Sequence, residues 1–133
     1  MDKAENTASI LLLSSEGVVR TILTETLRQA GYVVSATGSF GGAVDLLADG
    51  GIDMLIIRPH VDSISGYQAA KYLHERNQKM AVLVVAGLPD DDRIKYRDDL
   101  EGFATFPAPF TAAQLLARVE EVLKEAQERM AQA

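Results

Sequence analysis

Residues 9–17 read SILLLSSEG, and this stretch indicates more about the fold than any other part of the chain. Its apolar run, Ile10 to Leu13, is not interrupted by polar residues. Such a run is typical of a strand that is covered on both faces, as in a parallel sheet. Ser14 and Ser15 follow the run directly. Because function in parallel sheets gathers where the strands end, the role of these two serines is the central question.

Four more short apolar stretches are predicted to be strands, at residues 32–36, 53–57, 80–86 and 103–106. Apolar residues at helical spacing lie between and after them, which predicts helices at about residues 19–30, 40–49, 66–76, 90–101 and 112–126. This alternation describes five βα units. Right-handed crossovers then place helices on both faces of a five-stranded parallel sheet, so the sequence predicts an α/β fold.

Composition narrows the classes of function. The chain has 133 residues, which suits one domain, and it contains no Cys, so disulfides and thiolate chemistry are excluded. Acidic residues outnumber basic ones by 19 to 13, and the net charge of −6 argues against direct binding to nucleic acid. No apolar segment is long enough to cross a membrane, and the start, MDKAENTAS, has no signal sequence. We therefore expect a cytoplasmic protein that does not bind a membrane.

The order of these segments resembles the receiver domain of response regulators, the flavodoxin-like module of two-component signalling. ILLLSSEG is similar to the family's first strand, which ends in two acidic residues. IDMLIIRPHVDSISGY is similar to the strand that ends at the phosphate-accepting Asp and to the loop that follows it, with Gly66 opening the next helix. AVLVVAG and FATFPAPF are similar to the fourth and fifth strands. The resemblance implies a three-layer sandwich with five helices and the strand order 2-1-3-4-5.

The residues that carry the family's reaction are replaced here. Ser14 and Ser15 stand where the family has Mg²⁺-binding acids, and Arg58 stands where it has the phosphate-accepting Asp. Val85 stands at the position of a hydroxyl residue, and Ala108 at that of a Lys. Neutral hydroxyls are weak ligands for Mg²⁺, and a guanidinium repels it. The resemblance thus implies a pseudo-receiver that is not an enzyme, is not phosphorylated on Asp, and needs no metal ion or other cofactor.

The replaced residues have structural roles to fill. We expect Ser14 and Ser15 to cap the following helix and to form hydrogen bonds within the loop. Arg58 is expected to form an ion pair with Glu16 or Asp62, which would hold together a site that has lost its metal ion. Both expectations give Ser14, Ser15 and Arg58, at the rim where the strands of the sheet end, a structural role and not a catalytic one.

Two rival hypotheses use the same rim. One is an enzyme or a domain that binds a small ligand or an anion through Ser14, Ser15, Arg58 and His60. The other is a receiver that is phosphorylated in an unusual way, on Ser. No G-x-S-x-G sequence, which would indicate a strained nucleophilic serine, is present.

The resemblance also implies a face for partners. It includes the fourth predicted helix, the fifth strand and the fifth helix, and it places Ile94, Tyr96 and Thr105 there. The expected partner is another signalling protein or a second copy of the chain. Residues 1–8 are expected to be a disordered tail, residues 9–124 the receiver-like domain, and residues 125–133 an extension of the last helix.

Overall fold

The computed structural model describes residues 8–58, 60, 61, 64–86, 104–107 and 111–132. The elements follow one another as β1 (Ser9–Leu13), α2 (Gly17–Gln29), β2 (Val33–Thr37), α3 (Phe40–Ala48), β3 (Met54–Ile57), β4 (His60–Val61), β5 (Ile64–Ser65), α4 (Gly66–Arg76), β6 (Ala81–Ala86), β7 (Ala104–Pro107) and α7 (Ala112–Gln132). In the part of the chain that the structure describes, strands and helices alternate apart from the short β4–β5 pair and the step from β6 to β7, between which residues 87–103 are not described. Within these residues no helix has both the length and the apolar character that a membrane crossing requires.

The main sheet is parallel, with the strand order β2-β1-β3-β6 and with β7 beside β6 at the edge. Leu13 of β1 lies level with Ile57 of β3, and Ile57 lies level with Val84 of β6. The carboxyl ends of the inner strands therefore meet at one edge. This is the edge at which the polar residues after β1 and β3 were expected to gather.

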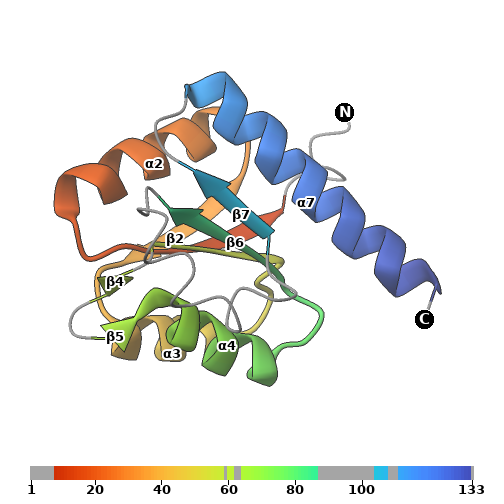
Figure 1. Cartoon of the computed structure of the whole chain (residues 1–133), viewed down its shortest axis with the longest axis horizontal. Helices are drawn as coiled ribbons and strands as arrows, with labels where there is room; N and C mark the ends of the chain where they lie inside the picture. The colour runs from red at the N-terminus through yellow and green to blue at the C-terminus, as the bar shows by residue number, and fades with distance from the viewer. Residues whose placement is uncertain (1–7, 59, 62–63, 87–103, 108–110, 133) are drawn as a thin grey trace.

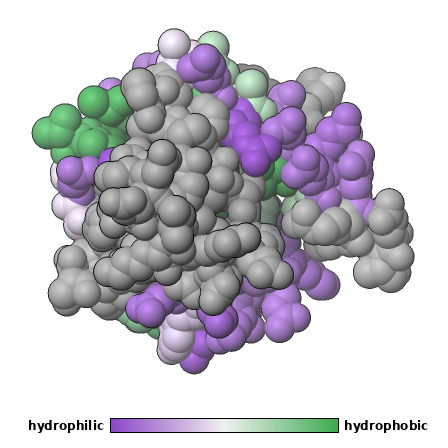
Figure 2. Space-filling model, in the orientation of Figure 1, coloured by the Kyte–Doolittle hydropathy of each residue, from purple (hydrophilic) through white to green (hydrophobic). Residues whose placement is uncertain are grey.

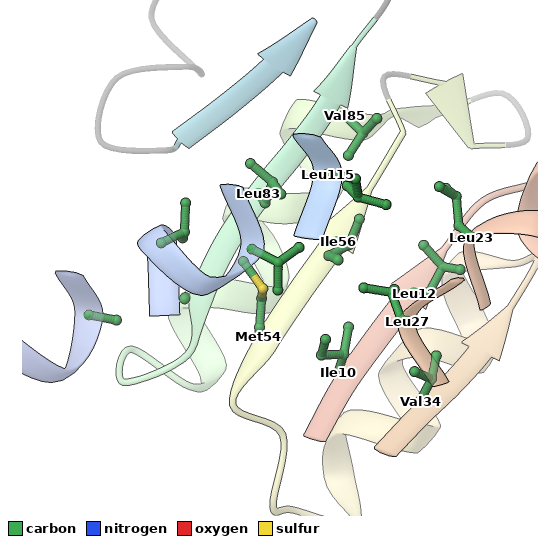
Figure 3. Close-up of a cluster of buried hydrophobic side chains, with 14 residues drawn as sticks. Ile10, Leu12, Leu23, Leu27, Val34, Met54, Ile56, Leu83, Val85 and Leu115 are labelled. Atoms are coloured by element: carbon green, nitrogen blue, oxygen red, sulfur yellow. The ribbon is translucent and has the colours of Figure 1, made fainter. Parts of the chain in front are cut away.

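Helices cover both faces of the sheet, with α2 and α7 on one side and α3 and α4 on the other (Figure 1). The inner strands are buried on both faces, which explains their unbroken apolar sequences. Alternate residues of each strand enter two separate apolar clusters. The cluster under α2 and α7 includes Ile10, Leu12, Met54, Ile56, Leu83 and Val85 (Figure 3), and the cluster under α3 and α4 includes Leu11, Leu13, Leu55, Ile57, Val82 and Val84.

The helix ends follow from local sequence. Ser39 caps α3 by accepting a hydrogen bond from the backbone N–H of Gly42, as its position in the sequence predicts. Thr111 caps α7 in the same way, through the backbone N–H of Gln114. Gly31, with a φ of 104°, ends α2 in the left-handed conformation that glycine adopts without strain.

The predicted α/β layering is confirmed, with differences in detail. The predicted strands and helices that the structure describes start and end within two residues of the predicted bounds, except that α7 continues six residues beyond position 126, to Gln132. The antiparallel hairpin of β4 and β5, which pairs His60 with Ser65, was not predicted, because its strands are only two residues long. The helix expected at residues 90–101 and residues 1–7 of the expected tail lie outside the described residues. Ala8, the last residue of that expected tail, accepts a hydrogen bond from the backbone N–H of Val33 at 3.0 Å, because it leads directly into β1.

The last helix is a single element of 21 residues, which corresponds to about 31 Å at 1.5 Å per residue. β6, against which it packs, has six residues and is about 20 Å long. Helix α7 therefore runs past the amino edge of the sheet (Figure 1). It continues without a break through position 124, where the resemblance places the end of the domain.

Candidate functional site

The sheet places Ser14, Arg58 and Val85 at the same level. The backbone N–H of Arg58 donates a hydrogen bond to the carbonyl of Leu13 at 3.2 Å, which extends the pairing of β1 with β3 by one residue. Because strand residues alternate between faces, all three side chains belong to the face covered by α2 and α7. Residues far apart in the sequence thus meet at one rim, at the carboxyl edge of the sheet.

Ser14 is an extension of β1. Its side chain is fully buried, its backbone N–H donates to the carbonyl of Thr37 at 3.1 Å, and its hydroxyl lies 3.5 Å from the carbonyl of Glu16. Ser15, in contrast, is exposed. The expectation that these serines cap the next helix is wrong, because Glu16 is the N-cap residue of α2 and no side chain caps that helix. Ser14 takes part in the loop hydrogen bonding that was the other expectation.

Arg58 forms an ion pair with Glu16. Its Nη2 atom lies 3.4 Å from Oε1 of Glu16, and the exposed fractions of the two side chains are 22% and 64%. This is one of the two pairings that the sequence predicts; the other candidate, Asp62, lies outside the described residues. The guanidinium therefore stands half-buried at the rim, bound on one side by a solvent-exposed carboxylate.

A second arginine at this rim was not singled out from the sequence. Arg20 extends from α2, and its Nη1 atom donates a hydrogen bond to the carbonyl of Ser14 at 2.7 Å. The guanidinium lies so close to Gly38 that a Cβ atom there would come within 2.6 Å of Nη1. A usable signal existed, because side chains in the first turns of a helix point back toward its start, and here the helix starts just after β1. Arg20 ties the helix to the end of the strand.

The remaining predicted site positions fall into two groups. Val85 is fully buried and packs in the apolar cluster with Leu83 and Leu115, so it belongs to the core and is not accessible at the rim (Figure 3). Thr105 lies in β7, where it pairs with Val84, and His60 begins β4. The other predicted positions lie outside the described residues; they are Ala108, Ile94 and Tyr96.

The described polar groups of the rim carry more positive than negative charge. They are two guanidiniums, one carboxylate and two hydroxyls, and one of the hydroxyls is buried. Within the described residues, no three His, Cys, Asp or Glu side chains lie close enough together to hold a metal ion. A single carboxylate that is already paired with a cation is a poor starting point for a magnesium site.

Comparisons with known proteins agree with this architecture. The family described as "Response regulator receiver domain" matches residues 10–120. Among curated proteins, the transcriptional regulatory protein CusR of Escherichia coli (strain K12) is 25% identical over 115 residues, which cover 86% of this chain and 51% of CusR. The chain thus spans about half the length of this relative.

Solved structures show the same fold. The signal receiver domain of an HD domain-containing protein from Pseudomonas fluorescens Pf-5 has a TM-score of 0.84 at 21% identity, with 96% of this chain and 94% of that chain covered. A response regulator receiver protein from Sinorhizobium medicae WSM419 has a TM-score of 0.78 at 24% identity, with 92% and 98% covered. Together with the family match over most of its length, these findings show that the chain belongs to the response regulator receiver domain family, whose members are signalling modules rather than enzymes.

Proposed function

We propose that this receiver domain signals through contact with another protein, without accepting phosphate on Asp and without binding Mg²⁺. The proposal concerns the rim formed by Ser14, Ser15, Arg58 and Glu16. In the part that the structure describes, the chain has the layers and the strand order of the receiver fold. A scaffold that keeps its shape while its reactive groups are replaced still offers surfaces to a partner.

The observation that carries the proposal is the position of Arg58. It follows β3 directly, where the resemblance places the phosphate-accepting carboxylate, and its guanidinium pairs with Glu16. A guanidinium stays protonated and cannot act as a nucleophile toward phosphorus. It also repels a divalent cation at about 5 Å by a few kcal/mol, even at an effective dielectric constant of 20–40.

The neighbouring positions support the same conclusion. Ser14 is buried and its hydroxyl faces a backbone carbonyl, so it offers no charge to a metal ion. Val85 is buried among apolar side chains and has no hydroxyl to bind a phosphoryl oxygen. Mg²⁺ in proteins is held by carboxylates together with water or phosphate oxygens, and the described rim has only Glu16 to offer.

One specific observation bears on phosphorylation at serine. Ser15 is exposed, whereas Ser14 is fully buried and could be modified only if β1 opened locally. If a serine of this rim is ever phosphorylated, we infer that Ser15 is the site. The same exposure leaves Ser15 and Arg58 as the groups through which a small anion would bind in the rival hypothesis.

The domain bounds and the setting belong to the same proposal. We infer a receiver unit over residues 9–124 and a helical extension from residue 125, which α7 carries to Gln132. The partner is a signalling protein or a second copy, and the place of action is the cytoplasm. The net charge of −6 favours protein contacts over direct binding to nucleic acid.

The test is incubation with Mg²⁺ and acetyl phosphate, followed by intact-mass measurement. The expected result is an unchanged mass, while a receiver that carries the reactive acids, treated in the same tube, gains one phosphoryl group. An acid-labile phosphoryl group on an aspartate of this chain would contradict the proposal. A group found on Ser15 in protein isolated from cells would instead support phosphorylation at serine.

A further inference from the structure

Within the described part of the chain, strand β2 has a neighbouring strand on one side only, because it stands at the end of the strand order. Val33 donates its N–H to a carbonyl just before β1 at 3.0 Å, and Thr37 accepts from the N–H of Ser14 at 3.1 Å, so both residues face β1. Backbone groups alternate in direction along a strand, so those of Val34 and Ala36 face outward. We call this outward side of Val33–Thr37 the β2 edge.

One of the outward groups of the β2 edge is already bound. Arg28, in the last turn of α2, donates a hydrogen bond from its Nη2 atom to the carbonyl of Val34 at 2.9 Å. Arg28 is an exposed residue, so the contact does not satisfy a charge inside the core. The guanidinium instead occupies an acceptor that an added strand would need.

The strand itself has none of the features that usually protect a sheet edge. Its sequence, VVSAT, contains no charged residue and no Pro, and its one-to-one register with β1 leaves no bulge. Other parts of the described surface are hydrophilic, as Figure 2 shows over α4 at the bottom and over α7 at the right. An unprotected edge is a template for pairing with another chain. Among the described residues, Arg28 is the one whose side chain is bonded to an outward group of this edge.

Strand β2 is complementary to itself in the antiparallel direction. In a pair centred on Ser35, Val34 would lie opposite Ala36 of the second copy, and their outward N–H and C=O groups would exchange both hydrogen bonds. Val33, which is 53% exposed, would lie opposite Thr37, and pairs of β-branched residues stabilise neighbouring strands. The two Ser35 side chains would meet at the centre, where their small size avoids a clash. This register needs the carbonyl of Val34 as an acceptor.

We propose that the β2 edge is a pairing surface for a second copy of this chain, and that Arg28 prevents the pairing. While the guanidinium is bonded to the carbonyl of Val34, the N–H of Ala36 in the second copy has no acceptor there, and the twofold symmetry repeats this loss in the other copy. Release of Arg28 would let the two sheets join edge to edge. The inference goes beyond the proposed function and does not depend on it, because it concerns the sheet edge and not the reaction at the rim.

The test compares the full chain with Arg28→Ala by sedimentation equilibrium, at a salt concentration that screens the net charge of −6 on each copy. Arg28→Ala should associate with itself at least about tenfold more tightly than the wild type, because two symmetry-related acceptors become free. Lys71→Ala removes the same charge from an exposed position on α4, so it is the matched control and should associate as the wild type does. Urea unfolding followed by circular dichroism checks that each variant is folded.

Hydrogen exchange measured by NMR identifies the surface. The amide of Ala36 should exchange freely in the wild type and should be protected in the Arg28→Ala pair, in proportion to the paired fraction. Adding Ala36→Pro to Arg28→Ala removes this outward N–H while leaving the bonds to β1 in place, and it should restore the association of the wild type.

Three results would overturn the inference. They are an Arg28→Ala chain that associates no more tightly than the wild type, a tighter association that leaves the amide of Ala36 unprotected, and protection of that amide in the wild type as its concentration rises. None of these results bears on phosphorylation, which the intact-mass measurement tests separately.

Discussion

The interior of the sheet and its carboxyl rim follow different rules in this molecule. The interior residues of β1 and β3 are fully buried and apolar, and they give the chain its receiver fold. One residue farther along the same strands, Ser14 and Arg58 stand where the resemblance places acids. The contrast teaches that the packing of the buried strand residues specifies the fold, whereas a few residues at the strand ends specify the reaction. The residues at the strand ends can therefore change while the buried residues, and with them the fold, are kept.

The largest effect is expected from an interior change. Leu12 is fully buried between α2 and the sheet, and Leu12→Ala should lower the free energy of unfolding by about 2–5 kcal/mol, because it removes apolar contacts and leaves a cavity. Urea denaturation followed by circular dichroism measures the change. Ser15→Ala, at the exposed rim, should change it by less than about 0.5 kcal/mol. Equal losses of unfolding free energy in Leu12→Ala and Ser15→Ala would contradict the distinction between the interior and the rim.

A second change concerns a polar group in the interior. The hydroxyl of Thr24 is buried and has no hydrogen-bond partner among the described residues. Thr24→Val keeps the shape and removes the unpaired hydroxyl, so it should raise the free energy of unfolding by about 1 kcal/mol. Thr21→Val, at an exposed position of the same helix, is the control for helix propensity. A loss of stability in Thr24→Val alone would show that the hydroxyl has a partner in solution.

The rim ion pair should contribute little to stability. Arg58 and Glu16 lie 3.4 Å apart, and the carboxylate side chain is 64% exposed. A double-mutant cycle with Arg58→Gln and Glu16→Gln should give a coupling energy below about 1 kcal/mol. Repetition at high salt should reduce it further. A coupling of several kcal/mol would mean that the rim contributes to the fold as the interior does.

The smallest expected effect on stability comes from the ionisation of Tyr32, just before β2, and it is confined to alkaline pH. Burial raises the pKa of Tyr32 above its usual value near 10, and the negative charge of Glu120 raises it further. Because the unfolded chain loses this proton at lower pH than the folded one, stability should fall as the pH rises above 10. Tyr32→Phe should lose this part of the decline, and Glu120→Gln should lower the pKa of Tyr32 in an NMR titration. If the pKa of Tyr32 is unchanged in Glu120→Gln, the Glu120 carboxylate does not contribute to the raised pKa.

Much of the fold could be predicted from the sequence, because short unbroken apolar runs that alternate with amphipathic segments are typical of parallel strands buried on both faces. Ser39 and Gly31 mark helix ends through local rules that can be read from the sequence. The β4–β5 hairpin could not be predicted, because strands of two residues leave no periodic pattern. The helix cap was predicted wrongly at Ser14, because the pairing of β1 with β2 extends one residue farther than the apolar run.

The candidate site was predicted in part. The meeting of Ser14 with Arg58 follows from strand order, and the pairing of Arg58 with Glu16 follows from charge. Arg20 was missed, although its place in the first turn of α2 indicates that its side chain points back toward β1. Its particular partner, the carbonyl of Ser14, also depends on the angle between helix and strand, which sequence spacing alone does not fix. The burial of Val85 is likewise a matter of how α7 packs on the sheet.

The central claim is that the rim, with serines and an arginine in place of acids, holds no magnesium ion. The most direct measurement is an NMR titration with Mg²⁺ in the millimolar range, run on the wild-type chain and on a variant that combines Ser14→Asp, Ser15→Asp and Arg58→Asp. We predict saturable shifts at the rim of the variant and none at the rim of the wild type. Saturable, site-specific shifts beside Arg58 in the wild-type chain would contradict the account.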